Sequence, residues 1–286
     1  MFRKYGFVGI VLIVISEIAI LQNINPIASW YFPIIWTGYI LLIDAIVYSI
    51  KHESFISSRP EQFAGLVALS AAFWWAFEFI NVFTQNWAYV SGSNTLNLFN
   101  YSVKATIAFA TVLPAIFETL ELILTLHLFD HAKLKKSHNI TKRFLHTMMG
   151  LGILFLILPI IFPTYFFPLV WFSFFFLLDP INYLHRQPSI IAHLKDRKLK
   201  VPLSLFLAGT LCGFLWEFWN YWAPVKWVYD LPYIGFLKVF EMPILGYIGY
   251  GPFAWELFAM YNFILSMRYA KHNPFLHTIF SKRELR

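Results

Sequence analysis

Long apolar segments recur along the whole chain and constrain its fold more than any other feature. The chain has 286 residues, of which 59% are hydrophobic, 20% aromatic and only 13% charged. Soluble domains carry about 25% charged residues, whereas about 20 consecutive apolar residues can cross a bilayer as a helix. We therefore expect an all-α polytopic membrane protein with eight transmembrane helices. These would span residues 6–22, 33–50, 62–83, 105–128, 145–162, 166–184, 202–222 and 243–267.

The distribution of basic residues predicts the orientation of these helices. With the N-terminus in the cytoplasm, 19 of the 22 Lys and Arg residues fall on the cytoplasmic side, and only Lys104, Lys226 and Lys238 fall outside. Cytoplasmic loops of membrane proteins carry an excess of Lys and Arg. The pattern therefore predicts an integral protein of the inner or plasma membrane with both termini cytoplasmic. The net charge of +7 follows from this topology, so we expect no nucleic-acid partner.

An internal repeat relates the two halves of the chain. The segment "YFPIIWTGYILLIDAIVY", from Tyr31, aligns without a gap with "FFPLVWFSFFFLLDPINY", from Phe166. Further along, Glu78 and Asn81 match Glu217 and Asn220, and the Pro-x-x-x-Glu motif that contains Glu118 matches the one that contains Glu256. We expect an N-terminal four-helix membrane repeat (1–135) and a C-terminal four-helix membrane repeat (136–286). Because four is an even number, both repeats would enter the membrane from the same side, as parallel repeats about a pseudo-two-fold axis.

The acids of these repeats are the candidate catalytic groups. Residues three apart lie on one helix face, so each Glu of a Glu-x-x-Asn motif projects with its Asn. Acids embedded in a membrane are expensive to bury and mark functional sites, and a carboxyl group in apolar surroundings stays protonated more readily and can donate its proton. We expect the working acid/base centre in the second repeat. The candidate catalytic residues are Glu217, Glu256, Asn220, Glu78, Glu118 and Asn81.

Aromatic and acidic residues around these motifs are the candidate substrate-binding groups. They are Trp216, Trp219, Tyr221, Trp75, Asp179, Asp44 and Glu241. A structural role is the alternative for the acids and for the Glu/Asn pairs, because polar side chains also hydrogen-bond membrane helices together. The repeated W-x-Y elements, Trp87 with Tyr89 and Trp227 with Tyr229, follow helix ends and are typical of interfacial anchors.

Several chemistries lack their motifs. The chain has no HExxH, GxSxG, P-loop or GxGxxG sequence. His127 and His131 are spaced four apart, but beside lysines at a cytoplasmic helix end, where a solvated polar face is expected. Cys212 is the single cysteine, which excludes an intramolecular disulfide. We expect no metal and no cofactor.

The duplicated acidic helices resemble the integral-membrane lycopene cyclase family, whose fused members join two such halves in one chain. The resemblance is carried by Asp44, "NWAY" and "LPAIFETLE" in the first half and by Asp179, "KWVY" and "GPFAWE" in the second. It implies that a carboxylic acid protonates a polyene or prenyl chain and so starts a cyclisation or isomerisation without a redox change. The implied partner is a membrane lipid or hydrophobic isoprenoid.

Two other functions are compatible with the sequence. A proton- or cation-coupled transporter would also use duplicated acids and broken helices. A non-catalytic lipid-binding membrane protein would use the same aromatic surface.

Overall fold

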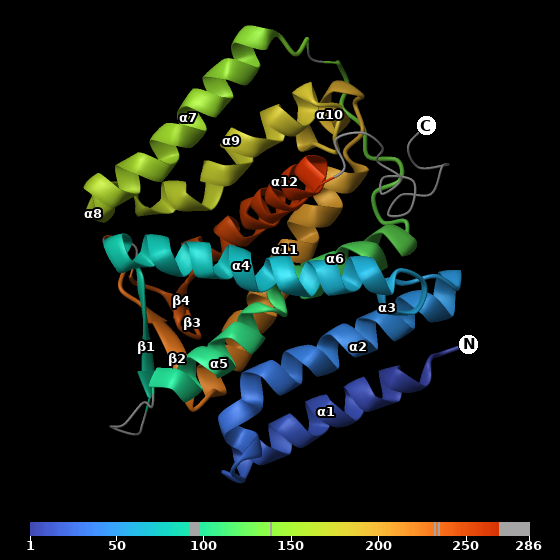
Figure 1. Cartoon of the computed structure of the whole chain (residues 1–286), viewed down its shortest axis with the longest axis vertical. Helices are drawn as coiled ribbons and strands as arrows, with labels where there is room; N and C mark the ends of the chain where they lie inside the picture. The colour runs from blue at the N-terminus through green and yellow to red at the C-terminus, as the bar shows by residue number, and fades with distance from the viewer. Residues whose placement is uncertain (92–97, 138, 232, 234, 269–286) are drawn as a thin grey trace.

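Helices make up most of the protein. The computed structural model describes residues 1–91, 98–137, 139–231, 233 and 235–268, and Figure 1 shows that it is nearly all-α. The long helices are α1 (Lys4–Leu21), α2 (Tyr31–Lys51), α4 (Pro60–Thr84), α5 (Leu98–Phe109), α6 (Val112–Thr125), α7 (Lys142–Ile161), α9 (Val170–Leu184), α11 (Lys200–Trp222) and α12 (Tyr250–Arg268). The shorter elements are the helices α3 (Phe55–Ser58), α8 (Pro163–Phe166) and α10 (Ile190–Lys195), the 3₁₀ helices η1 (Ile27–Trp30), η2 (Phe167–Leu169) and η3 (Ile244–Gly249), and the strands β1 (Trp87–Ser91), β2 (Val225–Tyr229), β3 (Lys238–Val239) and β4 (Met242–Pro243).

Seven helical segments of the described residues are long and apolar enough to cross a membrane, which indicates an integral membrane protein. They are Lys4–Leu21, Ile27–Lys51, Pro60–Thr84, Ser102–Thr125, Lys142–Ile161, Pro163–Leu184 and Lys200–Trp222. The eighth expected segment corresponds to α12, which has 19 residues but not the hydropathy of the other seven. It also begins later than expected, because residues 244–249 of the glycine-rich sequence form the 3₁₀ helix η3.

Local sequence explains where several helices begin or break. The hydroxyls of Thr141 and Ser189 cap α7 and α10 by accepting hydrogen bonds from backbone N–H groups. The span Ser102–Thr125 is broken between α5 and α6. Ser70 of α4 compensates for this break, since its Oγ donates to the Phe109 carbonyl and accepts from the Leu113 N–H at 2.9 Å.

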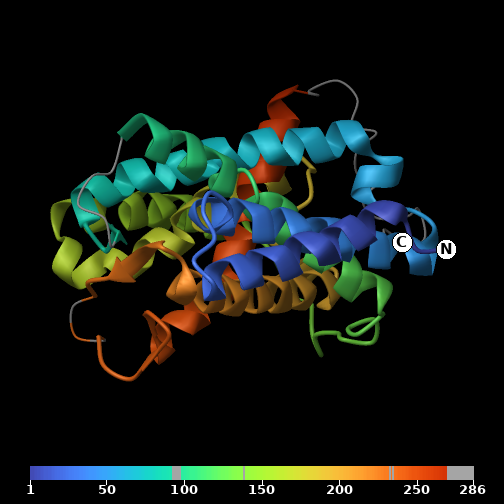
Figure 2. The same ribbon diagram turned by 90° about the horizontal axis from the view of Figure 1, so that it is seen from below.

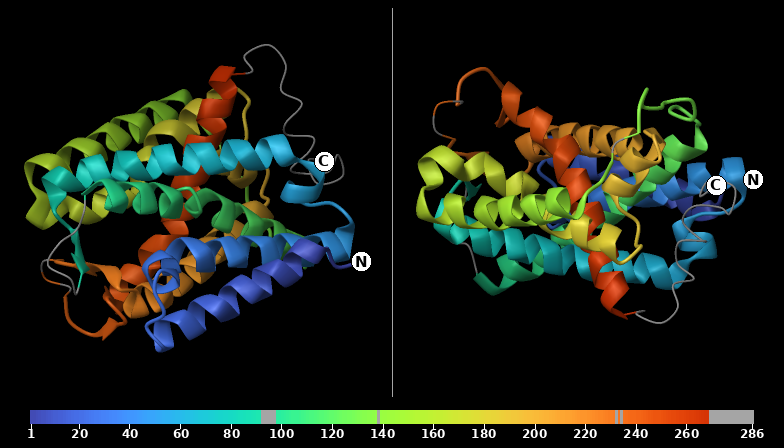
Figure 3. Two further views of the ribbon diagram at one scale, coloured as in Figure 1. Left: turned by 60° about the horizontal axis from the view of Figure 1, so that its bottom comes forward. Right: turned by 90° about the horizontal axis from the view of Figure 1, so that it is seen from above.

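Small residues and aromatic rings set how the helices cross. Gly9 of α1 and Gly38 of α2 face each other so closely that a Cβ built on either would lie within 3 Å of the other's carbonyl oxygen. At the centre of the bundle, α6 meets α12 through Phe117, whose ring centroid lies 5.0 Å from that of Tyr261. Figures 2 and 3 show that α12, in red, crosses α4 steeply.

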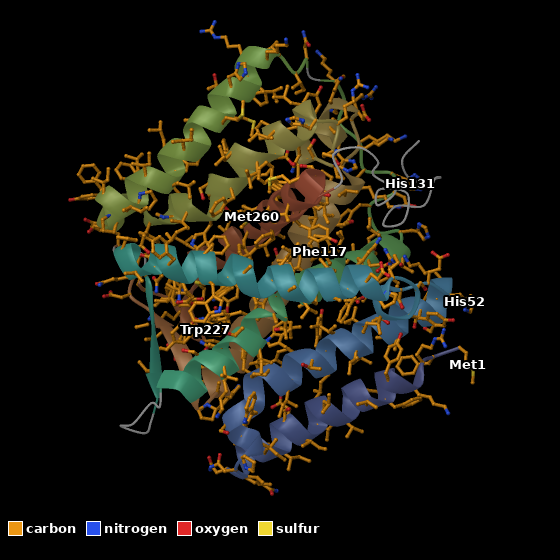
Figure 4. The ribbon with its side chains drawn as sticks, viewed as in Figure 1. Met1, His52, Phe117, His131, Trp227 and Met260 are labelled. Carbon is orange, nitrogen blue, oxygen red and sulfur yellow. The ribbon has the colours of Figure 1, made fainter. Side chains whose placement is uncertain are left out.

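The two ends of the bundle carry different structures. Figure 1 places β1–β4 and α8 toward one end and α3 and α10 toward the other. In Figure 4, Met1, His52 and His131 lie at the end that carries α3, as expected for segments on one side of a membrane. The assignment of this end to the cytoplasm stays a prediction. The C-terminal basic residues on which it partly depends, Lys271, Lys282, Arg283 and Arg286, lie outside the described residues.

The close crossing of α1 and α2 predicts that Gly38→Ala lowers stability. The added methyl group would lie 2.8 Å from the Gly9 carbonyl oxygen, and such overpacking costs about 1–3 kcal/mol. Gly65→Ala is the matched control, because no atom lies within 4 Å of its new Cβ and Ala favours a helix over Gly by up to about 1 kcal/mol. Thermal unfolding in detergent measures both. Equal midpoints for the two variants would contradict the close approach.

Candidate functional site

An aromatic cavity of about 400 Å³ lies between elements from both halves of the chain. This volume falls within the range of small-molecule sites, about 300–1,000 Å³. The cavity walls come from η1, α2, α4, β1, α5 and α6 of the first half and from η2, α9, α11, β2, β4, η3 and α12 of the second. Much of the wall is tryptophan and tyrosine, including Trp74, Trp87, Trp171, Trp216, Trp227 and Tyr250.

Strands β1 and β2 form one wall of this cavity. They pair antiparallel, with Trp87 opposite Tyr229 and Tyr89 opposite Trp227. Alternate residues of a strand face the same side, and these four residues all line the cavity. Figure 4 shows Trp227 below α4, beside β1. The expected role of these residues as interfacial anchors is therefore incomplete: Trp87 is only 7% exposed, and all four belong to the cavity wall.

Asn81 and Asn220 hold the two strands onto the helices that precede them. The Asn220 side chain donates to the Trp227 carbonyl at 2.8 Å and accepts from the Trp227 N–H at 2.9 Å. Asn81 donates to the Trp87 carbonyl at 2.8 Å and accepts from the N–H groups of Asn86 and Trp87. An asparagine amide can make both kinds of bond at once, so the structure gives these residues a supporting role at the site.

Glu217 lies behind the cavity wall, at the centre of a hydrogen-bond network. Its Oε1 accepts from the Tyr250 hydroxyl at 2.5 Å, the Tyr229 hydroxyl at 2.7 Å and the Trp227 indole N–H at 3.3 Å. The Glu217 side chain is fully buried, whereas the two tyrosines line the cavity. Burial raises the pKa of Tyr229 well above its usual value. The phenol therefore stays protonated and remains a donor.

Glu78 makes the corresponding contacts in the first half. Its Oε1 accepts from the Tyr89 hydroxyl at 2.5 Å, the Trp74 indole at 3.0 Å and the Trp87 indole at 3.2 Å. In contrast to Glu217, Glu78 is only half-buried. Each Glu-x-x-Asn motif thus binds the W-x-Y element that follows it, through the Asn to the backbone and through the Glu to the side chains.

Two glycines of α11 admit Tyr250 to Glu217. A Cβ at Gly209 would lie 2.2 Å from the Tyr250 carbonyl oxygen, and one at Gly213 would lie 2.2 Å from the Tyr250 ring. Gly209, Gly213 and Glu217 are spaced four apart and so share one helix face. The sequence spacing therefore creates a channel along α11 in which the Tyr250 ring lies with its hydroxyl at the carboxylate.

Of the four aromatic residues that we expected to bind substrate, one lies in the cavity wall and three lie outside it. Trp216 lines the cavity. Trp219 instead packs on Trp36, with ring centroids 4.9 Å apart, and its indole donates to Glu17 at 3.1 Å. Tyr221 and Trp75 are 40% and 41% exposed on the outside of their helices.

Three candidate acids also lie outside the wall. Glu241 pairs with Lys226 at 2.5 Å. Asp44 and Asp179 are buried near the end of the bundle that carries α3 and α10. Asp44 accepts from the Ile56 N–H at 2.8 Å, and Asp179 accepts from the N–H groups of Ile190 and Ile191 at 2.8 and 2.9 Å. These contacts support the structural alternative for both aspartates, because each ties a long helix to the short helix that follows.

Glu118 and Glu256 are fully buried but do not line the cavity. Glu256 accepts from the Phe174 N–H at 2.7 Å and the Ser173 hydroxyl at 3.2 Å, so the structure places it against α9, outside the hydrogen-bond network of Glu217. Neither carboxylate oxygen of Glu118 has a hydrogen-bond partner among the described residues. One turn along α6, Glu121 pairs with Lys51 at 2.5 Å and with Arg59.

The cavity wall also contains residues that were not among the candidates. Trp74, Trp171, Tyr250 and Phe253 line it, together with Lys104. The recurrence of W-x-Y in both halves was a sequence signal for part of this wall. Among the described residues, no group of three or more His, Cys, Asp or Glu side chains is placed to hold a metal ion.

No protein-family model, curated protein or solved structure matches the chain. The interpretation of the site therefore depends on its own geometry.

The role of Asn220 predicts that Asn220→Leu destabilises the cavity wall. The change keeps the side-chain size but leaves the Trp227 N–H and carbonyl without these partners, and each unsatisfied buried group costs about 1–3 kcal/mol. The unfolding midpoint should fall, and tryptophan fluorescence should change as β2 detaches. The adjacent Tyr221→Leu, on the exposed face, should change the midpoint little. If Asn220→Leu unfolds at the wild-type temperature, Asn220 does not anchor β2.

The contrast between Glu118 and Glu121 predicts stability changes of opposite sign. Glu118→Leu removes a buried carboxyl that has no hydrogen bond among the described residues and lies close enough to Asp44 for the two acids to interact, so stability should rise by about 1–3 kcal/mol. Glu121→Leu takes a partner from Lys51 and Arg59, and breaking a buried ion pair costs about 3–5 kcal/mol. Thermal unfolding of both variants measures the difference. A large loss of stability in Glu118→Leu would show that this carboxyl binds something inside the protein.

Proposed function

We propose that the protein is an integral-membrane enzyme that protonates an unsaturated hydrophobic chain, a polyene or prenyl lipid, and so starts its cyclisation or isomerisation. One observation carries this proposal: the hydroxyls of cavity-lining tyrosines are hydrogen-bonded to a fully buried carboxyl group. An apolar cavity with a few convergent polar groups is the usual form of a small-molecule site.

The proton would travel from Glu217 through Tyr250. The Tyr250 hydroxyl, which donates to Glu217 in the structure, would turn its proton toward one carbon of a double bond, transfer it there, and take the carboxylic-acid proton of Glu217 in its place. The π electrons of the double bond form the new C–H bond, and the neighbouring carbon becomes a carbocation. Attack by a second double bond within the chain would close a ring. Loss of a proton to Tyr250 and Glu217 by the reverse path then restores both groups and leaves a new double bond, so no oxidant or reductant is needed.

The cavity walls suit a cationic intermediate. The faces of tryptophan and tyrosine rings attract a cation, and Trp216, Trp227 and Tyr229 all line the cavity. An apolar enclosure also excludes water, which would otherwise capture the cation. The volume of about 400 Å³ suits one end of a long chain, with the remainder extending through the rim toward lipid.

We infer that the two four-helix halves are parallel repeats, with eight membrane helices and cytoplasmic termini. The matching contacts of Glu78 with Glu217 and of Asn81 with Asn220 support this inference. So does the strand register, in which the two W-x-Y elements pair with each other about Ala88 opposite Val228. We assign the working acid to the second half, because Glu217 is fully buried whereas Glu78 is half-buried.

Glu217→Gln tests the proposed acid. Glutamine keeps the shape and the hydrogen bonds but carries no transferable proton, so turnover should fall about 10²–10⁴-fold, the usual contribution of a general acid. Tyr250→Phe should cause a comparable loss, and Glu78→Gln a smaller one. The assay supplies acyclic polyenes and prenyl lipids in liposomes made with D₂O. It then measures deuterium incorporated into the product, which reports protonation directly.

Matched controls separate chemistry from folding. Glu61→Gln makes the same change at an exposed position near the other end of α4, and Tyr247→Phe removes a nearby hydroxyl that bonds to the Val239 carbonyl instead. Both should retain activity. The turnover of Glu256→Gln measures whether the second acid, which lies against α9, contributes to catalysis. Full activity in Glu217→Gln would sink the proposal, and bound lipid that is never converted would favour the lipid-binding alternative.

A further inference from the structure

One cationic side chain breaks the apolar wall of the cavity. Among the lining residues that the structure describes, Lys104 alone carries a charged group. Its Nζ donates to the Ser29 hydroxyl at 3.1 Å and lies 5.2 Å from the centre of the Trp30 ring. Lys104 is half-buried, whereas Ser29 is exposed, so the pair lies at the rim of the cavity.

Lys104 has no carboxylate among its described contacts, in contrast to three other partly buried lysines. Lys51, Lys200 and Lys226 pair with Glu121, Asp130 and Glu241 at 2.5, 2.9 and 2.5 Å. Ser29 offers no negative charge, and its hydroxyl already donates to the Pro26 carbonyl at 2.7 Å. A half-buried ammonium group beside an apolar wall is unfavourable unless an anion joins it. The geometry therefore leaves room for an anionic ligand group.

The side-chain amide of Asn86 is a second polar group of the cavity wall. Asn86 is 4% exposed and lines the cavity. Its backbone N–H and carbonyl bond to Asn81 and Asp230, but its side-chain amide makes no hydrogen bond within the described part of the chain. Buried polar groups are nearly always hydrogen-bonded, so this amide is a further point of attachment for a polar ligand atom.

The position of Lys104 indicates how such a ligand would lie. Lys104 belongs to the first turn of the candidate span Ser102–Thr125, at the depth where lipid headgroups meet the hydrocarbon. Further along this span, Ala108 and Val112 continue the wall, and Ala108, in the same helix as Lys104, lies about 6 Å further along the helix axis at 1.5 Å per residue. A charged group at Lys104 therefore leaves an attached chain beside the aromatic wall.

We propose that the ligand of this cavity is a single-chain amphiphile with an anionic headgroup, a phosphate or a carboxylate. Lys104, with Ser29, binds the headgroup at the rim, and the unsaturated chain lies along the aromatic wall toward Tyr250. This inference rests on the proposed function, whose substrate class it names. A purely hydrocarbon polyene has no group for Lys104 to bind.

The test compares three ligands with one chain and different heads. Geranylgeranyl monophosphate, geranylgeranoic acid and geranylgeraniol are titrated against the full-length protein in neutral-lipid nanodiscs, with quenching of tryptophan fluorescence as the readout. The phosphate, the acid or both should bind about tenfold more tightly than the alcohol, as expected for one charge-assisted contact. Tight binding of both anions would show that the site selects for negative charge alone. Tight binding of only one would identify the preferred headgroup.

Variants assign this preference to the rim. The preference is the ratio of the affinity for the anionic ligand to the affinity for the alcohol. Lys104→Gln should reduce this ratio to near one, and Lys104→Arg should retain most of it. Asn86→Leu should lower it to a smaller extent. Lys238→Gln is the matched control, because Lys238 is exposed and outside the wall. Unfolding midpoints confirm that each variant is folded. Equal binding of all three ligands by the wild type, or an unchanged preference in Lys104→Gln, would overturn the inference.

The same titration on Glu217→Gln separates this inference from the proposed reaction. In one outcome, the Glu217→Gln variant keeps the headgroup preference while the wild-type enzyme incorporates no deuterium. That result would support the binding site and contradict the proposed protonation. Conversion of a neutral polyene at equal rates by the wild type and Lys104→Gln would support the proposed protonation and contradict the headgroup site.

Discussion

A non-helical segment can lie against a membrane-embedded bundle only where its backbone polar groups find partners within the protein. Strands β1 and β2 meet this requirement by pairing with each other and by binding the side-chain amides of Asn81 and Asn220. The cavity wall depends on this arrangement, because the strands bring Trp87, Tyr89, Trp227 and Tyr229 inward. An indole or phenol at the end of a helix would otherwise settle at the membrane interface.

The same requirement distinguishes the buried acids. Asp44 and Asp179 accept hydrogen bonds from backbone N–H groups of the short helices that follow, and Asp44 also accepts from the hydroxyls of Tyr5 and Ser54. These bonds serve the fold. Glu217 accepts only from side chains, and all three of these residues, Trp227, Tyr229 and Tyr250, also line the cavity. A carboxyl whose partners are tyrosine hydroxyls can exchange a proton with a ligand, because a hydroxyl both gives and receives one. Two features therefore separate the candidate catalytic acid from the aspartates: the donors to Glu217 line the cavity, and none of them is a backbone N–H group.

The helices could be predicted from the sequence because long apolar runs bounded by Pro, Ser and charged residues leave few alternatives. The start of α12 could not, since the choice between 3₁₀ and α geometry at residues 244–249 depends on packing. The pairing of β1 with β2 could not be predicted from the sequence either. A W-x-Y element after a helix has the composition of an interfacial anchor, and its partner lies in the other half of the chain. The Glu/Asn spacing did predict that these residues act together, but it did not reveal that Glu217 and Glu256 would face different helices.

The strand register has a consequence for any ligand. If the two halves are parallel repeats, as proposed, the cavity has two similar walls and would offer an elongated molecule two nearly equivalent orientations, head to tail or reversed. At the spacing of 138 residues that relates Pro114 to Pro252, Lys104 corresponds to Met242, which also lines the cavity. A cation on one side and a thioether on the other make the two orientations unequal. The protein would thereby present the same end of every chain to the same acid, and a nearly symmetric enclosure would yield a single regioisomer.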